Sequence, residues 1–172
     1  KTLLKWGVDK KKITFIPNWG NLDQIKVGRK DYIFLKKNNL KKNKLRLVYT
    51  GTLALKHNPN LIVKIAENNL DMELLISANG SGFNDLKKIK NLPTNIKLLP
   101  LQPFKIFNKV LNSADIFLAM LNKEASKFSV PSKILNYLCA GKPIILSAPL
   151  INLSSKVIFD AKAGKTFDPA EF

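Results

Sequence analysis

The chain has 172 residues, of which 45 % are apolar and 24 % are charged, a globular composition that excludes a disordered or collagen-like protein. Its one cysteine, Cys139, and its one histidine, His57, exclude an internal disulfide framework and a zinc site built from cysteine or histidine pairs. The 29 basic residues outnumber the 12 acidic residues and give a net charge of +17 at pH 7.

Lysine supplies nearly all of this positive charge, because only Arg29 and Arg46 are arginines. Proteins that read nucleic-acid bases favour the planar fork of arginine, so we expect no nucleic-acid partner. Most of the excess charge falls within residues 1–46. Two interpretations stay open: attraction to anionic lipid headgroups or a phosphorylated acceptor, and an organism-wide lysine bias. No run of 18 apolar residues is present, so we expect no membrane span.

Three short pieces precede the regular part of the chain. Residues 1–8 are typical of the last turns of a helix, with a glycine near its end. Residues 13–16 predict a short strand, and the lysine-rich residues 21–44 predict a linker that carries a short helix around residues 31–37. Because the chain lacks an initiator methionine and starts within a predicted helix, we expect a fragment in which residues 1–20 are the tail of a preceding domain.

From residue 45 onward, short apolar runs alternate with segments of helical spacing. This alternation predicts an α/β domain over residues 45–172, with a doubly wound, mostly parallel sheet and helices on both faces in a Rossmann-like fold. The expected strands are residues 45–49, 72–76, 96–99, 116–120 and 143–146, with a sixth helix–strand unit at 157–161 and 166–167. Ligands of such sheets bind beyond the carboxyl ends of the strands, so the loops that follow the strands are the candidate sites.

The loop after the first strand predicts a phosphate site. Gly51 lets a ligand approach the backbone, and Thr52 follows it. Asn58 and Pro59 suit the start of the next helix, whose free N–H groups and positive dipole end favour an anion. Lys56 adds a mobile positive charge. An ordinary strand-to-helix turn with a surface lysine is the alternative interpretation.

The next two loops carry weaker signals. Residues 77–82 contain Gly80 in a Gly-x-Gly pair, which is not a dinucleotide fingerprint because a third glycine is missing. A flexible turn that caps the next helix explains this loop equally well. The proline-flanked pair Leu101 and Gln102 forms a rigid loop suited to presenting backbone groups to a flat base.

The loop after the fourth strand, residues 121–133, is the richest in polar side chains. It leads into a predicted helix whose free N–H groups, together with Ser129, Ser132 and Lys133, favour a second anion site. Glu124 is the only acid of this loop and is placed to hold a sugar hydroxyl, with a solvated carboxylate as the alternative. Three such loops on one sheet edge predict a ligand that combines phosphates, a polar group and a base.

Four segments of the chain resemble a known family in their order and spacing. They are VYTGTLALKHNP (48–59), LISANGSG (75–82), LNSADIFLAML (111–121) and SVPSKILNYLCAGKPII (129–145). They are similar to the C-terminal, donor-binding domain of retaining family 4 glycosyltransferases, which pair two Rossmann-like domains in the GT-B arrangement. ITFIPNWGN (13–21) resembles the connection between those domains. The Pro-Ser-Lys and Ala-Gly-Lys-Pro pieces resemble the branch that builds bacterial surface polysaccharides from UDP-sugars.

The resemblance implies a role for each candidate residue. The donor diphosphate would be bound by Gly51, Thr52, Lys56, Ser129, Ser132 and Lys133, the base by Leu101 and Gln102, and the ribose or sugar by Glu124, Asn136 and Gly80. The family's usual pair of glutamates is absent, because Phe128 and Asn136 stand at those positions. Asn136 can still form a hydrogen bond with a hydroxyl, but it carries no charge. No catalytic residue is assigned within this chain.

The implied function is transfer of a sugar from a UDP-sugar to a polysaccharide or a lipid-linked acceptor. Residues 45–172 would be the nucleotide-sugar domain and residues 21–44 a basic linker, whereas the N-terminal acceptor domain would lie outside this chain, which alone would be inactive. We expect no metal or other cofactor, because lysines and helix dipoles can neutralise the diphosphate. We expect a cytoplasmic location, with peripheral contact to an anionic membrane as an option. The alternatives are half of a two-domain sugar-nucleotide epimerase and a basic module that binds nucleic acid or membrane.

Overall fold

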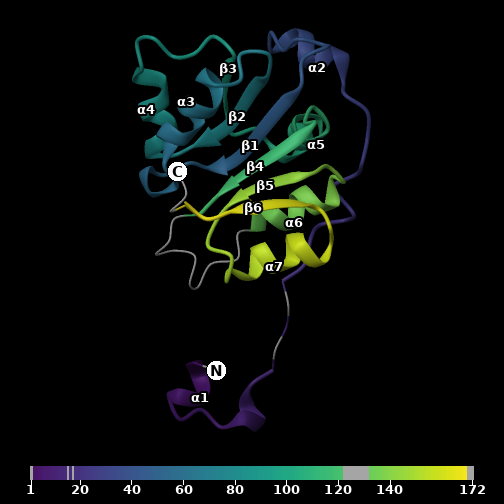
Figure 1. Cartoon of the computed structure of the whole chain (residues 1–172). Coiled ribbons are helices and arrows are strands. Elements are labelled where there is room, and N and C mark those ends of the chain that lie inside the picture. Colours follow the sequence, from purple (N-terminus) through teal and green to yellow (C-terminus); the bar gives the residue numbers. More distant parts are fainter. Residues whose placement is uncertain (1, 15, 17, 122–131, 170–172) are drawn as a thin grey trace.

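Figure 1 shows the computed structural model of the chain, which describes residues 2–14, 16, 18–121 and 132–169. Six parallel strands form one sheet in the order β3-β2-β1-β4-β5-β6. The strands are β1 (Arg46–Thr52), β2 (Glu73–Asn79), β3 (Ile96–Pro100), β4 (Ile116–Met120), β5 (Ile144–Ser147) and β6 (Gly164–Phe167). The α-helices are α1 (Thr2–Lys5), α2 (Tyr32–Lys37), α3 (Pro59–Glu67), α4 (Ser81–Lys88), α5 (Phe104–Asn112), α6 (Ser132–Cys139) and α7 (Leu153–Asp160), and the 3-10 helices are η1 (Lys10–Lys12) and η2 (Leu55–His57). The predicted doubly wound α/β fold is confirmed.

Two layers of helices cover the two faces of the sheet, and alternate strand residues point to one layer or the other. Leu47 and Tyr49 of β1 belong to the core cluster that contains residues of α3 and α4. Val48 belongs to the cluster that contains residues of α2, α5, α6 and α7. Strand order reverses between β1 and β4, so the carboxyl ends of these two strands mark the switch point at which ligands bind in open α/β sheets.

Strand β4 has the predicted bounds, whereas β1 and β2 run beyond their predicted ends to Thr52 and Asn79. Parallel pairing of Gly51 with Ala78 and of Thr52 with Asn79 explains this extension, because backbone pairing includes residues of low strand propensity. The glycine of the first candidate loop therefore belongs to the end of a strand, which fixes its position at the sheet edge.

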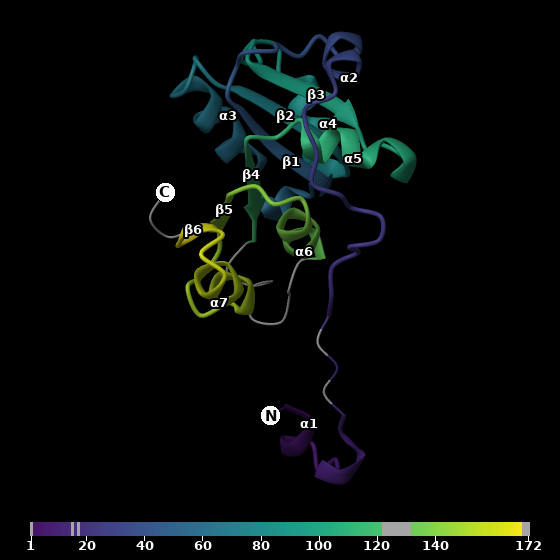
Figure 2. The ribbon, with the colours of Figure 1, turned by 90° about the vertical axis from the view of Figure 1, so that its right-hand side faces the viewer.

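The strand predicted at residues 13–16 is wrong for the described residues 13, 14 and 16, which have no regular structure. Figures 1 and 2 show α1 and η1 well away from the sheet, and no strand among the described residues pairs with residues 13, 14 or 16. An apolar run without a partner strand leaves its backbone N–H and C=O groups unpaired, and it therefore has no reason to extend into a strand.

The lysine-rich segment 21–44 packs against the sheet domain. Ile25, Phe34, Leu35 and Leu40 are buried in the same core cluster as residues of α5 and α6. The predicted short helix is confirmed as α2, which Asp31 caps by accepting a hydrogen bond from the Phe34 amide at 2.9 Å. The charged residues of this segment therefore surround four apolar anchors that tie it to the domain.

Two asparagines of α5 hold the backbone of this segment in place. The Asn108 side chain accepts from the Lys26 amide at 3.2 Å and donates to the Gln24 carbonyl at 2.5 Å. Asn112 accepts from the Gly28 amide at 2.9 Å and donates to the Lys26 carbonyl at 3.2 Å. We call Asn108 and Asn112 the asparagine clamp. It docks the incoming chain on a helix that also lines the site described below.

Candidate functional site

A cavity of about 380 Å³ lies at the carboxyl edge of the sheet, where the ends of β1 and β4 meet. It is lined by Thr50, Gly51, Thr52, His57, Leu101, Phe107, Met120, Leu121, Ser132, Lys133 and Asn136. These residues come from the ends of β1 and β4, from η2, from the loop after β3, from α5 and from α6. The cavity therefore occupies the switch point, and we call it the switch-point pocket.

Hydrogen bonds to two buried tyrosines fix the end of β1 at the floor of this pocket. The Thr50 amide donates to the Tyr137 hydroxyl at 2.9 Å, and Tyr137 stacks on Phe117 of β4 with ring centroids 4.0 Å apart. The Tyr49 hydroxyl donates to the Thr52 carbonyl at 2.7 Å. Burial raises the pKa of Tyr49 far above its ordinary value and that of Tyr137 to about 12, so both phenols stay neutral donors.

The Lys133 side chain crosses the edge of the sheet beside Gly51. Gly51 has a φ of +96°, and a Cβ atom at this position would lie 3.8 Å from both Cε and Nζ of Lys133. The Lys133 ammonium passes from α6 over Gly51 and lies 3.8 Å from the centroid of the Tyr49 ring. Two loops that are far apart in the sequence therefore meet at a lysine, as the predicted anion sites require.

The Lys133 Nζ atom is buried and has no hydrogen-bond partner among the described residues. Burial lowers the pKa of this ammonium from its ordinary value to about 7. The Tyr49 ring face offers a favourable cation–π contact, but it replaces only part of the lost hydration. The pocket therefore contains a cationic donor that has no anionic acceptor among the described residues.

Six of the predicted site residues line the switch-point pocket. They are Gly51, Thr52, Leu101, Ser132, Lys133 and Asn136. The structure thus brings the loops after the first, third and fourth strands to one cavity. Lys56 lies in η2 beside the lining residue His57, and its side chain is outside the described part of the structure. Ser129 and Glu124 also lie outside the described residues.

Gly80 and Gln102 are not among the residues that line the pocket. Gly80 has a φ of +103°, and a Cβ atom there would lie 2.8 Å from the Leu53 carbonyl oxygen, so this position needs glycine for a close backbone crossing. The Gln102 side chain donates to the Pro100 carbonyl at 2.8 Å, which turns it back on its own loop. Their predicted contacts with the sugar and the base stay predictions.

Several lining residues had no predicted role. His57 is one of them, and its Nδ1 accepts a hydrogen bond from the Ala54 amide at 3.2 Å. Phe107, Met120 and Leu121 supply an apolar wall. A polar residue after a strand is a visible signal, but an apolar wall has the same sequence pattern as the core.

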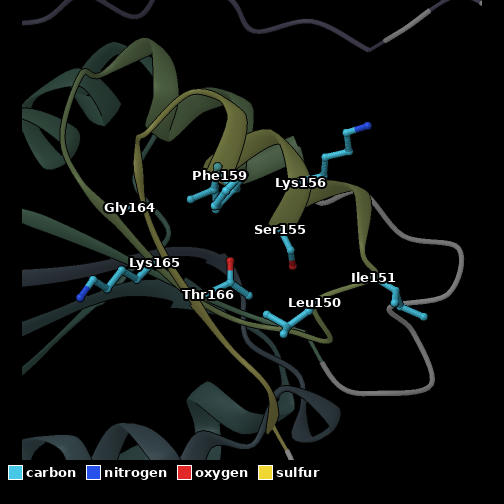
Figure 3. A pocket seen from close by; sticks show the side chains of 9 residues that line it. Leu150, Ile151, Ser155, Lys156, Phe159, Gly164, Lys165 and Thr166 are labelled. Atoms are coloured by element: carbon cyan, nitrogen blue, oxygen red, sulfur yellow. The ribbon is translucent and has the colours of Figure 1, made fainter.

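A second cavity, of about 580 Å³, lies between α7 and the edge strand β6 (Figure 3). Leu150, Ile151 and Phe159 line it and are largely exposed, and Lys156 and Lys165 are the charged residues of its wall. This cavity is larger but lies at the edge of the sheet rather than at the switch point. The convergence of strand ends, a helix start and a buried lysine makes the smaller cavity the candidate site.

Within the described residues, no three histidine, cysteine, aspartate or glutamate side chains are grouped so that they could hold a metal ion. The same residues include no helix that is long and apolar enough to cross a membrane.

Comparisons with known proteins agree with the fold. No family model matches the chain. It is 24 % identical over 148 residues to the "Putative colanic acid biosynthesis glycosyl transferase WcaI" of Escherichia coli strain K12, a match that covers 83 % of this chain and 36 % of that protein. WaaG, a glycosyltransferase involved in lipopolysaccharide biosynthesis, superposes with a TM-score of 0.66 at 14 % identity over 95 % of this chain and 45 % of that one. The chain has a Rossmann-like fold of the GT-B glycosyltransferase kind.

The calicheamicin glycosyltransferase CalG4 shares this GT-B-like fold, with a TM-score of 0.55 and 18 % identity over 76 % of this chain and 31 % of that one. The chain thus spans less than half the length of each of these three proteins.

Proposed function

We propose that the chain is the donor-binding half of a glycosyltransferase and binds the diphosphate of a UDP-sugar in the switch-point pocket. The observation that carries this proposal is the convergence of Gly51 and the buried Lys133 ammonium, which has no hydrogen-bond partner among the described residues, at the start of α6. Glycine gives backbone access, the helix start offers free N–H groups, and lysine offers positive charge. Each of these three features is a separate attraction for a diphosphate.

The proposal assigns the remaining parts of the donor to the other walls. The base would lie against Leu101 and Phe107, and the ribose or sugar would face Asn136, whose amide can both donate and accept. Lys56, which adjoins the pocket in η2, would add a second positive charge at the diphosphate. Sugar transfer leaves a UDP group with increased negative charge, so the same groups would stabilise both the bound donor and the leaving group.

We propose a polysaccharide or lipid-linked acceptor, bound by a second domain of a longer protein, and a retaining family 4 reaction. The support is the motif resemblance, the biosynthetic roles in the names of WcaI and WaaG, and the share of those proteins that the chain spans. The proposal includes a cytoplasmic location with peripheral contact to an anionic membrane. It includes diphosphate binding without a metal ion, because lysine and helix N–H groups can supply the positive charge.

Binding of UDP to purified variants tests the site. Loss of a charge-assisted contact costs about 1.5–3 kcal/mol, which is roughly a ten- to hundredfold loss of affinity. We expect Lys133→Ala and Lys56→Ala to weaken UDP binding by that factor, and the exposed-residue control Lys37→Ala to leave it unchanged. Calorimetry in excess chelator measures the affinities, and circular dichroism checks folding.

Amide shift mapping locates the bound nucleotide on the same protein. We expect UDP to shift resonances of residues 51–56, 100–103 and 132–136, with no comparable response to a DNA oligomer at moderate salt. Equal UDP affinity of the three variants, or shifts confined to residues 26–46, would contradict the site. Loss of UDP binding in chelator would contradict metal-free binding alone.

A further inference from the structure

The surroundings of Lys133 contain no counter-ion among the described residues. The ammonium lies 3.8 Å from the centroid of the Tyr49 ring, and a Cβ atom at Gly51 would lie 3.8 Å from Nζ. The wall from α5, the ends of β3 and β4, and Ser132 is uncharged. Among the described residues that line the pocket, the ionisable side chains are His57 and Lys133.

We propose that Lys133 is neutral in much of the empty protein near and above neutral pH, and takes up a proton when the donor diphosphate enters the pocket. This inference rests on the proposed function, because it concerns the ligand of the same site. Donor binding is then coupled to protonation, because the bound diphosphate favours the charged form of the Lys133 amine.

The physical argument compares the ammonium in the empty and occupied pockets. In the empty pocket Nζ has lost its water and has no hydrogen-bond acceptor, so burial lowers the pKa of Lys133 to about 7. A diphosphate beside Nζ supplies both a negative charge and acceptor oxygens, and either effect raises the pKa of an amine. Binding and protonation must then favour each other, because linkage between two equilibria is reciprocal.

Linkage fixes the pH dependence. Well below pH 7, Lys133 is already protonated in the empty pocket, so binding of the donor takes up few protons. Above pH 7 binding must first protonate the amine, so donor affinity should fall by about tenfold per pH unit until the pKa of the occupied state is reached. At pH 8 the uptake should be roughly 0.9 proton per ligand, and at pH 6 roughly 0.1.

His57 is the other ionisable side chain among the described residues that line the pocket, so its contribution needs a separate control. Its Nδ1 atom accepts a hydrogen bond from the Ala54 amide, and the side-chain oxygen of asparagine can replace this acceptor. His57→Asn therefore removes the imidazole ring while keeping an acceptor for the Ala54 amide. If Lys133 carries the proton uptake, this variant keeps it.

The test uses UDP-glucose, whose diphosphate is esterified at both ends and therefore has no phosphate proton that titrates near pH 7. Calorimetric titrations at pH 8 in two buffers with different ionisation enthalpies give the number of protons taken up. We expect about 0.9 for the wild-type chain and for His57→Asn. We expect close to zero for Lys133→Arg, because a guanidinium stays charged in the empty pocket.

A second measurement needs no ligand. The ε-carbon resonance of Lys133, assigned through its loss in Lys133→Arg, should titrate with a midpoint near 7, well below the ordinary range of a lysine side chain. UDP-glucose binding without proton uptake, uptake that persists in Lys133→Arg, or a Lys133 midpoint near 10 would overturn the inference while the proposed function stands. Failure of UDP and UDP-glucose to bind the folded chain at any pH would overturn the proposed function and the coupled binding with it.

Discussion

Burying the Lys133 ammonium lowers the stability of the fold wherever the group is charged, because Nζ is dehydrated and lacks a hydrogen-bond acceptor among the described residues. The pKa of Lys133 is about 7 in the folded chain and has its ordinary value near 10 in the unfolded chain. Between these values the unfolded chain binds more protons, so this residue makes stability rise with pH. The full cost is present below pH 7 and has faded by about pH 10.

Replacing Lys133 by methionine should remove that cost. We expect Lys133→Met to raise the free energy of unfolding most at pH 6 and progressively less toward pH 10, with the gain shrinking by up to about 1.4 kcal/mol per pH unit. Urea unfolding at pH 6, 8 and 9.5 measures this difference. The exposed control Lys37→Met should show no such trend. A gain in unfolding free energy that is constant with pH would show that burial of the Lys133 charge does not destabilise the fold.

At the scale of secondary-structure elements, the sequence was sufficient to predict the sheet and the loops that carry the site. Buried parallel strands are short apolar runs, so the bounds of β4 could be predicted from its sequence alone. The carboxyl ends of β1 and β2 could not be predicted in this way, because the pairing of these two strands with each other determines where they end. The stacking of Lys133 on Tyr49 was also beyond prediction, since it depends on a side chain that crosses the edge of the sheet at Gly51.

The asparagine clamp could not be predicted from the sequence either, because no sequence pattern links α5 to a backbone more than 80 residues away.

The hydrogen bonds of the clamp yield a prediction about stability. Asn112→Ala should destabilise the fold by about 1–3 kcal/mol, because the half-buried Gly28 amide loses its acceptor. The matched control is Asn60→Ala, at an exposed position of α3. Urea unfolding compares the two, and equal midpoints would show that the Asn112 hydrogen bonds do not stabilise the docking of segment 21–44.

At the scale of the whole molecule, positive charge and exposed aromatic residues coincide at the N-terminal end. Trp6 and Trp19 are 74 % and 76 % exposed, and the lysine run of η1 lies between them in the chain. The part of this end that holds α1 and η1 stands apart from the sheet domain in two views at right angles (Figures 1 and 2). Indole rings favour the boundary between headgroups and acyl chains, and lysines favour anionic headgroups, so this end is chemically suited to a membrane surface.

We therefore expect the chain to sediment with vesicles that contain phosphatidylserine and not with phosphatidylcholine vesicles, and high salt should reverse the binding. Each lysine near an anionic surface contributes about 1 kcal/mol, so replacing the three lysines of η1 by glutamine should weaken binding by about two orders of magnitude. The charge-matched control replaces the exposed lysines 87, 88 and 90, on and just after α4, by glutamine. If attraction depended only on the net charge of +17, the two triple variants would lose the same affinity. If η1 contacts the membrane locally, the η1 variant should lose far more vesicle affinity than the control. Equal losses would show that the binding depends on the net charge of the whole chain and not on η1.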